Sequence, residues 1–436
     1  MWTFSTAHRR LALLLSAIIS MVSVGCSDPL IEGDGLRPES RPGIGSLKEG
    51  SANINEIGCP DYPSYYFTHL DDTECRKTLP SDRDRSFVCP NVSSTARVYS
   101  PVLDRSVSYV QAEANPIVDE TALVGMVPDD MRITLILVRR VNGVPHYRYL
   151  SNGRQDEVFQ PWSSTKFMAV ANAGSTLRHL SNGQVGLTAH VDSTPIGDLI
   201  SIVHNYDERA YTSNGLARWF LNVGTRSQLD RFIHDDWLGR PQHETLGGNY
   251  GHPTPDIAYE MTGDDGSITL DGLDGRGPAN QLSTFTIAEF LKRLVMHRED
   301  PSIAMPNLEW GDVQTLLYGA SDSTMYAPND PQGMEGDTTV YLQSALDMER
   351  VEANSQGRWR IFSKLGFGYA RGGEFVNAAY GCFPTLDEMG QVVPDWGKEF
   401  FIVTQLNGQG RHHDTDERLA QIYQRLVSAV MDGTLK

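Results

Sequence analysis

The sequence predicts an α/β (α+β) fold in which strands near both ends of the chain flank a largely helical middle. Residues 132–150 are rich in apolar and β-branched residues and turn at Asn142 and Gly143, the signature of a β-hairpin. Three more strand-like segments lie near the other end of the chain: 358–368, 375–383 and 399–406. Apolar residues then repeat at intervals of three and four up to Met431, which predicts a closing helix that begins with a capping box at Asp414 and Glu417.

The segment FQPWSSTKFMAVANAG, residues 159–174, predicts a short buried helix that carries reactive side chains. Pro161 and Trp162 mark its start, and Gly174 is expected to end it. Ser163 and Lys166 are three residues apart, so their side chains share one face and a lysine amine can take the serine proton. The positive end of the helix would lie at Ser163, where negative charge develops in acyl transfer.

The chain uses lysine sparingly, with 7 lysines against 30 arginines. It places one of them, Lys166, beside the apolar Phe167 and Met168. Arginine never deprotonates, whereas a desolvated lysine can be neutral near pH 7 and act as a base. S-x-x-K alone also occurs on solvated helix faces, so the segment leaves both interpretations open.

Two later motifs follow in a fixed order. The segment 211–214 reads Tyr-Thr-Ser-Asn, and 364–366 reads Lys-Leu-Gly on a predicted strand. With these motifs the chain resembles the serine β-lactamase and penicillin-binding protein superfamily over residues 129–436. The resemblance implies an antiparallel sheet built from both chain ends and flanked by helices, plus an all-helical subdomain at about 175–350. A Gly/Asp-rich insertion would account for the long interval before Lys364.

The resemblance also implies catalytic roles. Ser163 would attack a carbonyl and form an acyl-enzyme, with Lys166 as general base. Asn214 would hold the substrate amide, and Thr212 would pass a proton to the leaving nitrogen. Lys364 would supply positive potential near the substrate carboxylate.

The oxyanion hole implied by the resemblance consists of the backbone N–H groups of Ser163 and Phe367, next to Gly366 of the third motif. Leu365 stands where the family has Thr or Ser, so a hydroxyl that helps to bind a substrate carboxylate is missing. We therefore expect weak affinity for ordinary penicillins. The family's deacylating E-x-x-L-N sequence is absent, and Glu244, its nearest candidate, is expected to be an exposed acid in a Gly-rich loop.

Residues 1–26 resemble a bacterial lipoprotein signal peptide, with a basic start, an apolar run and Gly25 before Cys26. We expect export to the periplasm and a lipid anchor on Cys26, with Ser27 favouring the outer membrane. Residues 27–55 are expected to be a flexible tether. Residues 56–128 are expected to form a small cysteine-containing module or an extension packed on the hydrolase domain.

Four further cysteines in an oxidising compartment suggest two disulfides: Cys59, Cys75, Cys89 and Cys382. Their connectivity stays open among three possibilities. A local bridge among the first three is expected, and Cys382 would tether the N-terminal region to a core strand.

Nothing in the sequence indicates a cofactor or a metal site. His412 and His413 are expected in a solvated loop, and the Asp-rich stretch 263–277 lacks the spacing of a calcium loop. A net charge of −18 argues against nucleic acid as a partner. The predicted partners are a small β-lactam or a peptidoglycan peptide as substrate, and a membrane through the lipid anchor.

Three functions remain open from the sequence. The first is a serine hydrolase that opens a β-lactam or a related amide. The second is a peptidoglycan D,D-peptidase, which the missing deacylation sequence favours. The third is a non-catalytic binding lipoprotein on the same fold, which Thr212 and Leu365 favour.

Overall fold

The computed structural model describes residues 78–206, 209–248, 250, 253–270, 277, 279–337, 339–368, 373–408 and 412–436. The predicted signal peptide, Cys26, the tether, Cys59 and Cys75 lie outside the described residues. Among the helices described, none has the length and hydropathy needed to cross a membrane.

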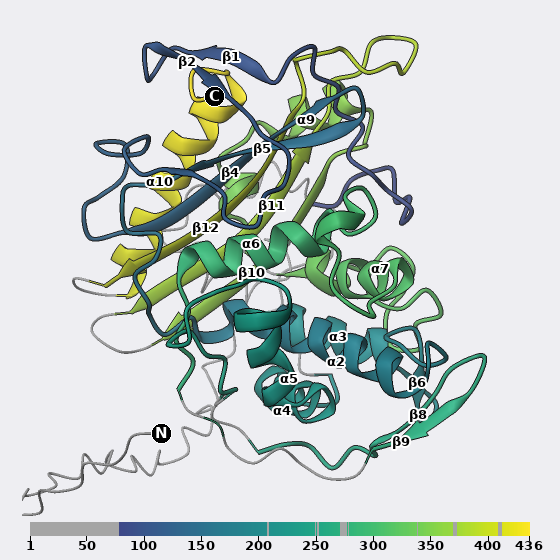
Figure 1. Ribbon diagram of the computed structural model, residues 1–436. Helices are drawn as coiled ribbons and strands as arrows, with labels where there is room; N and C mark the ends of the chain where they lie inside the picture. Colours follow the sequence, from purple (N-terminus) through teal and green to yellow (C-terminus); the bar gives the residue numbers. More distant parts are fainter. Residues whose placement is uncertain are drawn as a thin grey trace, which may run out of the picture. The chain divides into compact units, whose positions relative to one another are not determined.

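A six-stranded sheet joins the two ends of the described chain (Figure 1). Its strands, in spatial order, are β10 (Arg360–Gly368), β11 (Glu374–Phe383), β12 (Lys398–Asn407), β4 (Arg132–Val141), β5 (Val144–Leu150) and β3 (Val118–Asp119). All neighbours are antiparallel except β3, which runs parallel to β5. The predicted hairpin is confirmed, because Asn142 and Gly143 both have positive φ between β4 and β5.

Side chains alternate between two buried layers, one on each face of the sheet. Leu135 and Leu137 of β4 join the layer under α10 (His412–Met431), whereas Ile136 and Val138 face the other helices. Figure 1 shows α10 on one face and α6 and α2 on the other. The closing helix is therefore confirmed, but it begins at His412, within the pair of histidines that we expected in a loop.

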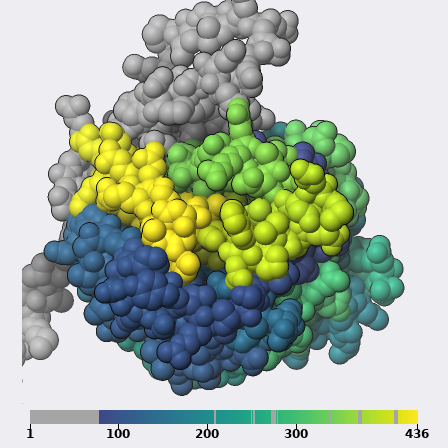
Figure 2. Space-filling model, turned by 90° about the horizontal axis from the view of Figure 1, so that it is seen from above, coloured from purple at the N-terminus to yellow at the C-terminus, as the bar shows by residue number. Residues whose placement is uncertain are grey.

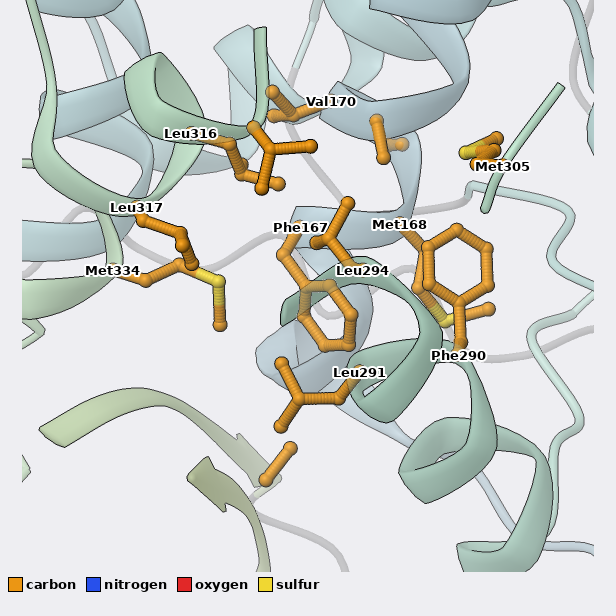
Figure 3. Packing of buried hydrophobic residues seen from close by; sticks show 14 of the residues in the cluster. Phe167, Met168, Val170, Phe290, Leu291, Leu294, Met305, Leu316, Leu317 and Met334 are labelled. Carbon is orange, nitrogen blue, oxygen red and sulfur yellow. The ribbon is translucent and has the colours of Figure 1, made fainter. Parts of the chain in front are cut away.

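The second face is covered by helices packed around one apolar cluster. These are α2 (Lys166–Leu180), α3 (Ile196–Asn205), α4 (Ser213–Gly224), α5 (Arg226–Arg231), α6 (Thr284–Val295) and α7 (Trp310–Tyr318). Three shorter helices complete this layer: η4 (Phe232–Asp236), η5 (Pro301–Ile303) and η6 (Gly333–Gly336). The helices α8 (Tyr341–Ser344) and α9 (Met348–Ser355) instead join α10 in the layer on the first face. In Figure 3, Phe167 and Met168 of α2 lie among Phe290, Leu291 and Leu294 of α6, which fixes the helix that follows Ser163.

The expected end of α2 at Gly174 is wrong, since the helix continues to Leu180. A Cβ at Gly174 would lie 2.7 Å from Leu187 Cγ and 2.9 Å from Leu308 Cδ1. The glycine therefore serves close packing of the helix against its neighbours instead of ending it.

The expected all-helical subdomain also contains a small antiparallel sheet. It consists of β7 (Thr194–Pro195), β6 (His190–Val191), β8 (Glu260–Thr262) and β9 (Ser267–Thr269). Strands of two or three residues carry too little periodicity to be predicted. The strands β8 and β9 flank the start of the Asp-rich stretch, and the described residues contain no cluster of potential metal ligands.

Residues 78–128 run as an extension along the sheet. They include the hairpin β1 (Arg97–Ser100) and β2 (Arg105–Ser108), and a disulfide joins Cys89 to Cys382 of β11. This disulfide confirms the prediction that Cys382 links the N-terminal region to a core strand.

A cavity of about 830 Å³ lies between this extension, the loop after β11 and the C-terminal end of α10. These three segments meet on the face seen in Figure 2, in blue, lime and yellow. Arg139, Arg350 and Trp396 line the cavity, whereas Ser163 is not part of its wall.

Candidate active site

Ser163 lies in a single 3-10 turn, η3 (Trp162–Thr165), directly before α2. Its side chain is half-buried, whereas Ser164 is buried and donates a hydrogen bond to Pro161 O at 2.7 Å. Trp162 has a φ of 51°, a conformation that costs a bulky residue free energy and often marks functional sites. Its indole Nε1 donates to Glu374 Oε2 at 2.8 Å, which holds this turn against the start of β11.

Lys166 is the first residue of α2 and is fully buried. Its Nζ donates to Ser213 Oγ at 2.8 Å and to Asn214 Oδ1 at 2.6 Å. The rings of Tyr206 and Tyr250 lie 5.3 and 5.6 Å from the same nitrogen. The first and second sequence motifs therefore meet at the amine of Lys166.

Thr212 was predicted to pass a proton to the leaving nitrogen, but its neighbour Ser213 provides the hydroxyl that lies at Lys166. Thr212 is the N-cap of α4, and its Oγ1 accepts a hydrogen bond from Gly215 N at 3.1 Å. The hydroxyl that contacts Lys166 belongs to Ser213, which also donates to Val203 O at 2.7 Å. Sequence reasoning missed Ser213 because it aligned the motif by the spacing of its first and last residues.

Lys364 of β10 is fully buried and forms an ion pair with Asp337, which is also fully buried, at 3.3 Å. The other carboxylate oxygen of Asp337 accepts a hydrogen bond from Ser363 Oγ at 3.0 Å. Burial lowers the pKa of Lys364 to about 8, although the carboxylate of Asp337 acts in the opposite direction. Asp337 was missed, because it lies in the insertion between the second and third motifs and belongs to no motif.

The ring of Tyr206 lies near the amines of both Lys166 and Lys364. Its ring centroid lies 3.7 Å from Lys364 Nζ, and its hydroxyl donates to Leu365 O at 2.8 Å. His204, two residues earlier, is buried, and its Nδ1 lies 2.8 Å from Ile200 O. Burial, followed by the positive charge of Lys364, lowers the pKa of His204 to about 3, so this imidazole is neutral at physiological pH.

Gly366 places the edge strand β10 directly against the turn that carries Ser163. A Cβ at this position would lie 2.7 Å from Ser164 N and closer still to Pro161 O. The backbone of β10 thus approaches the Ser163 N–H, as an oxyanion hole requires. The Phe367 side chain points away and packs on Phe375, with ring centroids 4.8 Å apart.

The expectation that position 365 faces the substrate carboxylate is wrong. The Leu365 side chain is fully buried in the layer between the sheet and α10, on the opposite face from Lys364. Successive residues of a strand point to opposite faces, so a hydroxyl at this position would enter the core. Leu365 consequently has no direct part in binding a carboxylate.

The expectation for Glu244 is also wrong, since this side chain is fully buried. Its Oε1 pairs with Arg240 at 3.1 Å, and its Oε2 accepts from Ser283 N and Oγ, both at 3.0 Å. Glu244 therefore joins its loop to the N-terminus of α6. Tyr250, further along this loop, reaches Lys166 and lies 3.4 Å from Thr165 Oγ1.

No family model matches the chain. No curated protein matches it in sequence. Solved structures of class A β-lactamases resemble it at a distance. One, from Sphaerobacter thermophilus, is 13% identical with a TM-score of 0.39, covering 71% of this chain and 95% of that one.

Another, described as the class A β-lactamase of the last common ancestor of Gram-negative bacteria, is 15% identical with a TM-score of 0.38. The match covers 71% of this chain and 98% of that one. Both likenesses are distant, so the function of this chain has to be inferred from its own side chains.

Proposed function

We propose that this protein is a serine hydrolase that forms an acyl-enzyme on Ser163 and acts on a β-lactam or a related amide. The observation that carries the proposal is the position of Lys166, which is fully buried three residues after Ser163 and donates to the uncharged oxygens of Ser213 and Asn214. An unprotonated lysine amine has a lone pair that can accept the Ser163 proton.

The reaction then proceeds in two steps, acylation of Ser163 and hydrolysis of the acyl-enzyme. Ser163 Oγ forms a bond to the substrate carbonyl carbon while its proton passes to Lys166, and the bond to the leaving group breaks as that group takes up a proton. The Ser213 hydroxyl, which contacts Lys166, provides a path for this second transfer. Water afterwards attacks the acyl ester, releases the carboxylic acid and restores the Ser163 hydroxyl.

The negative charge on the carbonyl oxygen needs two donors during both steps. The backbone N–H groups of Ser163 and Phe367 are suited to this role, because Gly366 brings β10 against the Ser163 turn. Asn214, which accepts from Lys166 through Oδ1, keeps its amide N–H groups for the substrate carbonyl.

A second candidate, a peptidoglycan D,D-peptidase that retains its acyl group, is favoured by Glu244. Both oxygens of this carboxylate are engaged by Arg240 and Ser283. A base occupied in this way is poorly placed to activate a water for deacylation. Slow deacylation would give stable labelling in place of turnover.

The test is covalent labelling followed by intact-mass spectrometry. A fluorophosphonate should add one phosphonyl group to the wild type and none to Ser163→Ala, while Ser164→Ala, the neighbouring serine, should still be labelled. Equal labelling of wild type and Ser163→Ala would refute the proposal. A fluorescent penicillin and a chromogenic cephalosporin then separate stable labelling from turnover.

We also propose that the protein is exported to the periplasm and anchored by a lipid on Cys26, with the outer membrane as its site. The basic start, the apolar run and Gly25 before Cys26 support this. The full-length protein should partition into detergent and give a diacylglyceryl N-terminal peptide that Cys26→Ser abolishes. A mature chain with an unmodified Cys26 would contradict it.

A further inference from the structure

The charge balance around Lys364 bears on which substrates the Ser163 site accepts. A lysine can attract a substrate carboxylate only with the charge that its protein partners leave uncompensated. Here the Lys364 ammonium lies 3.3 Å from the Asp337 carboxylate, and neither side chain is exposed. The pair is neutral as a unit, so little attraction for a second carboxylate remains.

Tyr206 adds a steric barrier to this balance. Its ring lies 3.7 Å from Lys364 Nζ, and the bond from its hydroxyl to Leu365 O fixes the ring over the ammonium. Ser163 is partly exposed, whereas Lys364 is fully buried. A substrate can therefore reach the nucleophile without reaching the ammonium.

The neighbouring end of the sheet carries a further negative charge. Glu374, paired in register with Gly368 of β10, is partly exposed and accepts hydrogen bonds from Trp162 Nε1 and Gln405 Nε2 at 2.8 and 2.7 Å. A carboxylate on a substrate bound near this end of β10 would be repelled by the like charge of Glu374 on the neighbouring strand β11. No hydroxyl at position 365 offsets this repulsion, because the residue is a leucine whose side chain points into the core on the other face of the sheet.

We infer that the Ser163 site takes neutral esters or amides, whose leaving group carries no carboxylate, and that Asp337 sets this preference. The inference rests on the proposed serine-hydrolase function and narrows its substrate from β-lactams and related amides to neutral amides and esters. Penicillins and cephalosporins, which carry a carboxylate, then serve only as slow probes of Ser163. In chemical terms the scissile C–O or C–N bond breaks toward an uncharged alcohol or amine, and no ion pair with Lys364 forms in the complex.

The experiment uses two aryl acetates of the same shape. Both release a phenol with a meta substituent, which is a carboxylate in one ester and a carboxamide in the other. The kcat/KM of each, divided by its rate of hydroxide hydrolysis, removes the difference in leaving-group reactivity. The wild type should prefer the carboxamide ester at least about tenfold, a factor that corresponds to about 1.4 kcal/mol.

The matched variants assign the preference to one carboxylate. Asp337→Asn leaves the Lys364 charge uncompensated and should shift the ratio toward the carboxylate ester by about tenfold or more. Asp312→Asn alters another fully buried aspartate, paired with Arg178 at 2.8 Å away from this site, and should leave the ratio unchanged.

The outcomes separate the two proposals. If neither ester is cleaved and Ser163 is not labelled by the fluorophosphonate, the proposed function fails, and this inference with it. If Ser163 is acylated but the wild type prefers the carboxylate ester or is indifferent, only the inference is overturned. The wild-type ratio tests the substrate preference even if Asp337→Asn does not fold. If Asp337→Asn folds and its ratio is unchanged, Asp337 does not set the preference.

Discussion

Two buried lysines of this protein, Lys292 and Lys166, have very different partners. Lys292 of α6 donates to Glu289 Oε1 at 2.9 Å and to the Tyr149 hydroxyl at 2.6 Å. Arg293 Nε also donates to Glu289 Oε1, at 2.8 Å. Although burial alone would raise it, the two cations hold the pKa of Glu289 below its ordinary value.

Lys166 instead donates to a hydroxyl and a side-chain amide, neither of which carries charge. A carboxylate favours the protonated form of a lysine, whereas neutral acceptors accommodate either form. The comparison teaches that burial alone does not make a lysine a base. Burial lowers the pKa of Lys292, and the Glu289 carboxylate opposes that shift; the hydroxyl and the amide that Lys166 contacts carry no charge that would oppose it, and we propose that Lys166 therefore exchanges its proton.

The largest effect on stability is expected at the structural lysine. Glu289→Gln leaves Lys292 and Arg293 as two buried cations without their shared carboxylate and should lower the free energy of unfolding by about 3–5 kcal/mol. Urea denaturation of the variant measures this, with the exposed Glu417→Gln as a control expected within about 0.5 kcal/mol of wild type. A loss below about 1 kcal/mol would mean that the α6 network is not structural.

Leu365→Thr should act on the core and not on the substrate. Replacing a fully buried leucine by a smaller, polar side chain should cost about 2–3 kcal/mol of unfolding free energy. The rate of acylation by a penicillin should not rise in the folded variant. Single-turnover kinetics measure that rate, and an increase of tenfold would put position 365 back into the substrate site.

Gly366→Ala tests the contact between β10 and the Ser163 turn. Its Cβ would push β10 away from Pro161 and Ser164, which should lower the free energy of unfolding by about 1–3 kcal/mol. Acylation should be slower because the oxyanion donors move. Gly311→Ala is the matched control, since the nearest atom to a Cβ there is 3.7 Å away. Normal acylation by Gly366→Ala would contradict the proposed position of the oxyanion hole.

The smallest expected effect is a pH dependence at Lys364. Its ammonium contacts Asp337 and the Tyr206 ring and lowers the pKa of nearby His204, and burial lowers its own pKa from 10.5 to about 8. Acylation should therefore fall above about pH 8, when deprotonation leaves Asp337 as an unbalanced anion beside the site. The pKa of His204 is about 3, so its titration does not contribute in this range.

Two controls follow from the same linkage. Because Asp337 is the anion that deprotonation of Lys364 leaves unbalanced, Asp337→Asn should abolish the alkaline loss of acylation. The unfolded chain keeps the Lys364 proton up to about pH 10.5, so this group should make the fold more stable as pH rises from about 8 to 10.5. A wild-type acylation rate that stays flat up to pH 10 would contradict the assignment.

Local sequence patterns predicted much of the sheet, the closing helix and the Ser163–Lys166 turn. Alternating apolar residues and an Asn-Gly turn depend on neighbouring positions, so they could be read from the chain. Asp337 and Tyr206 could not, because a buried carboxylate and a ring over Lys364 depend on how distant segments pack. The role predicted for Thr212, passing a proton to the leaving nitrogen, shows a different limit. Thr212 caps α4, and the hydroxyl that contacts Lys166 belongs to the next residue, Ser213.

The central claim is that Lys166 is the base for Ser163, and the rate of acylation of Lys166→Arg tests it most directly. Arginine keeps the positive charge and cannot accept a proton, so the rate constant for fluorophosphonate labelling at pH 7 should fall by about 10²–10⁴-fold. Lys292→Arg, the same substitution at the structural lysine, should label at nearly the wild-type rate wherever it is folded. A Lys166→Arg protein that labels within threefold of wild type would contradict the account.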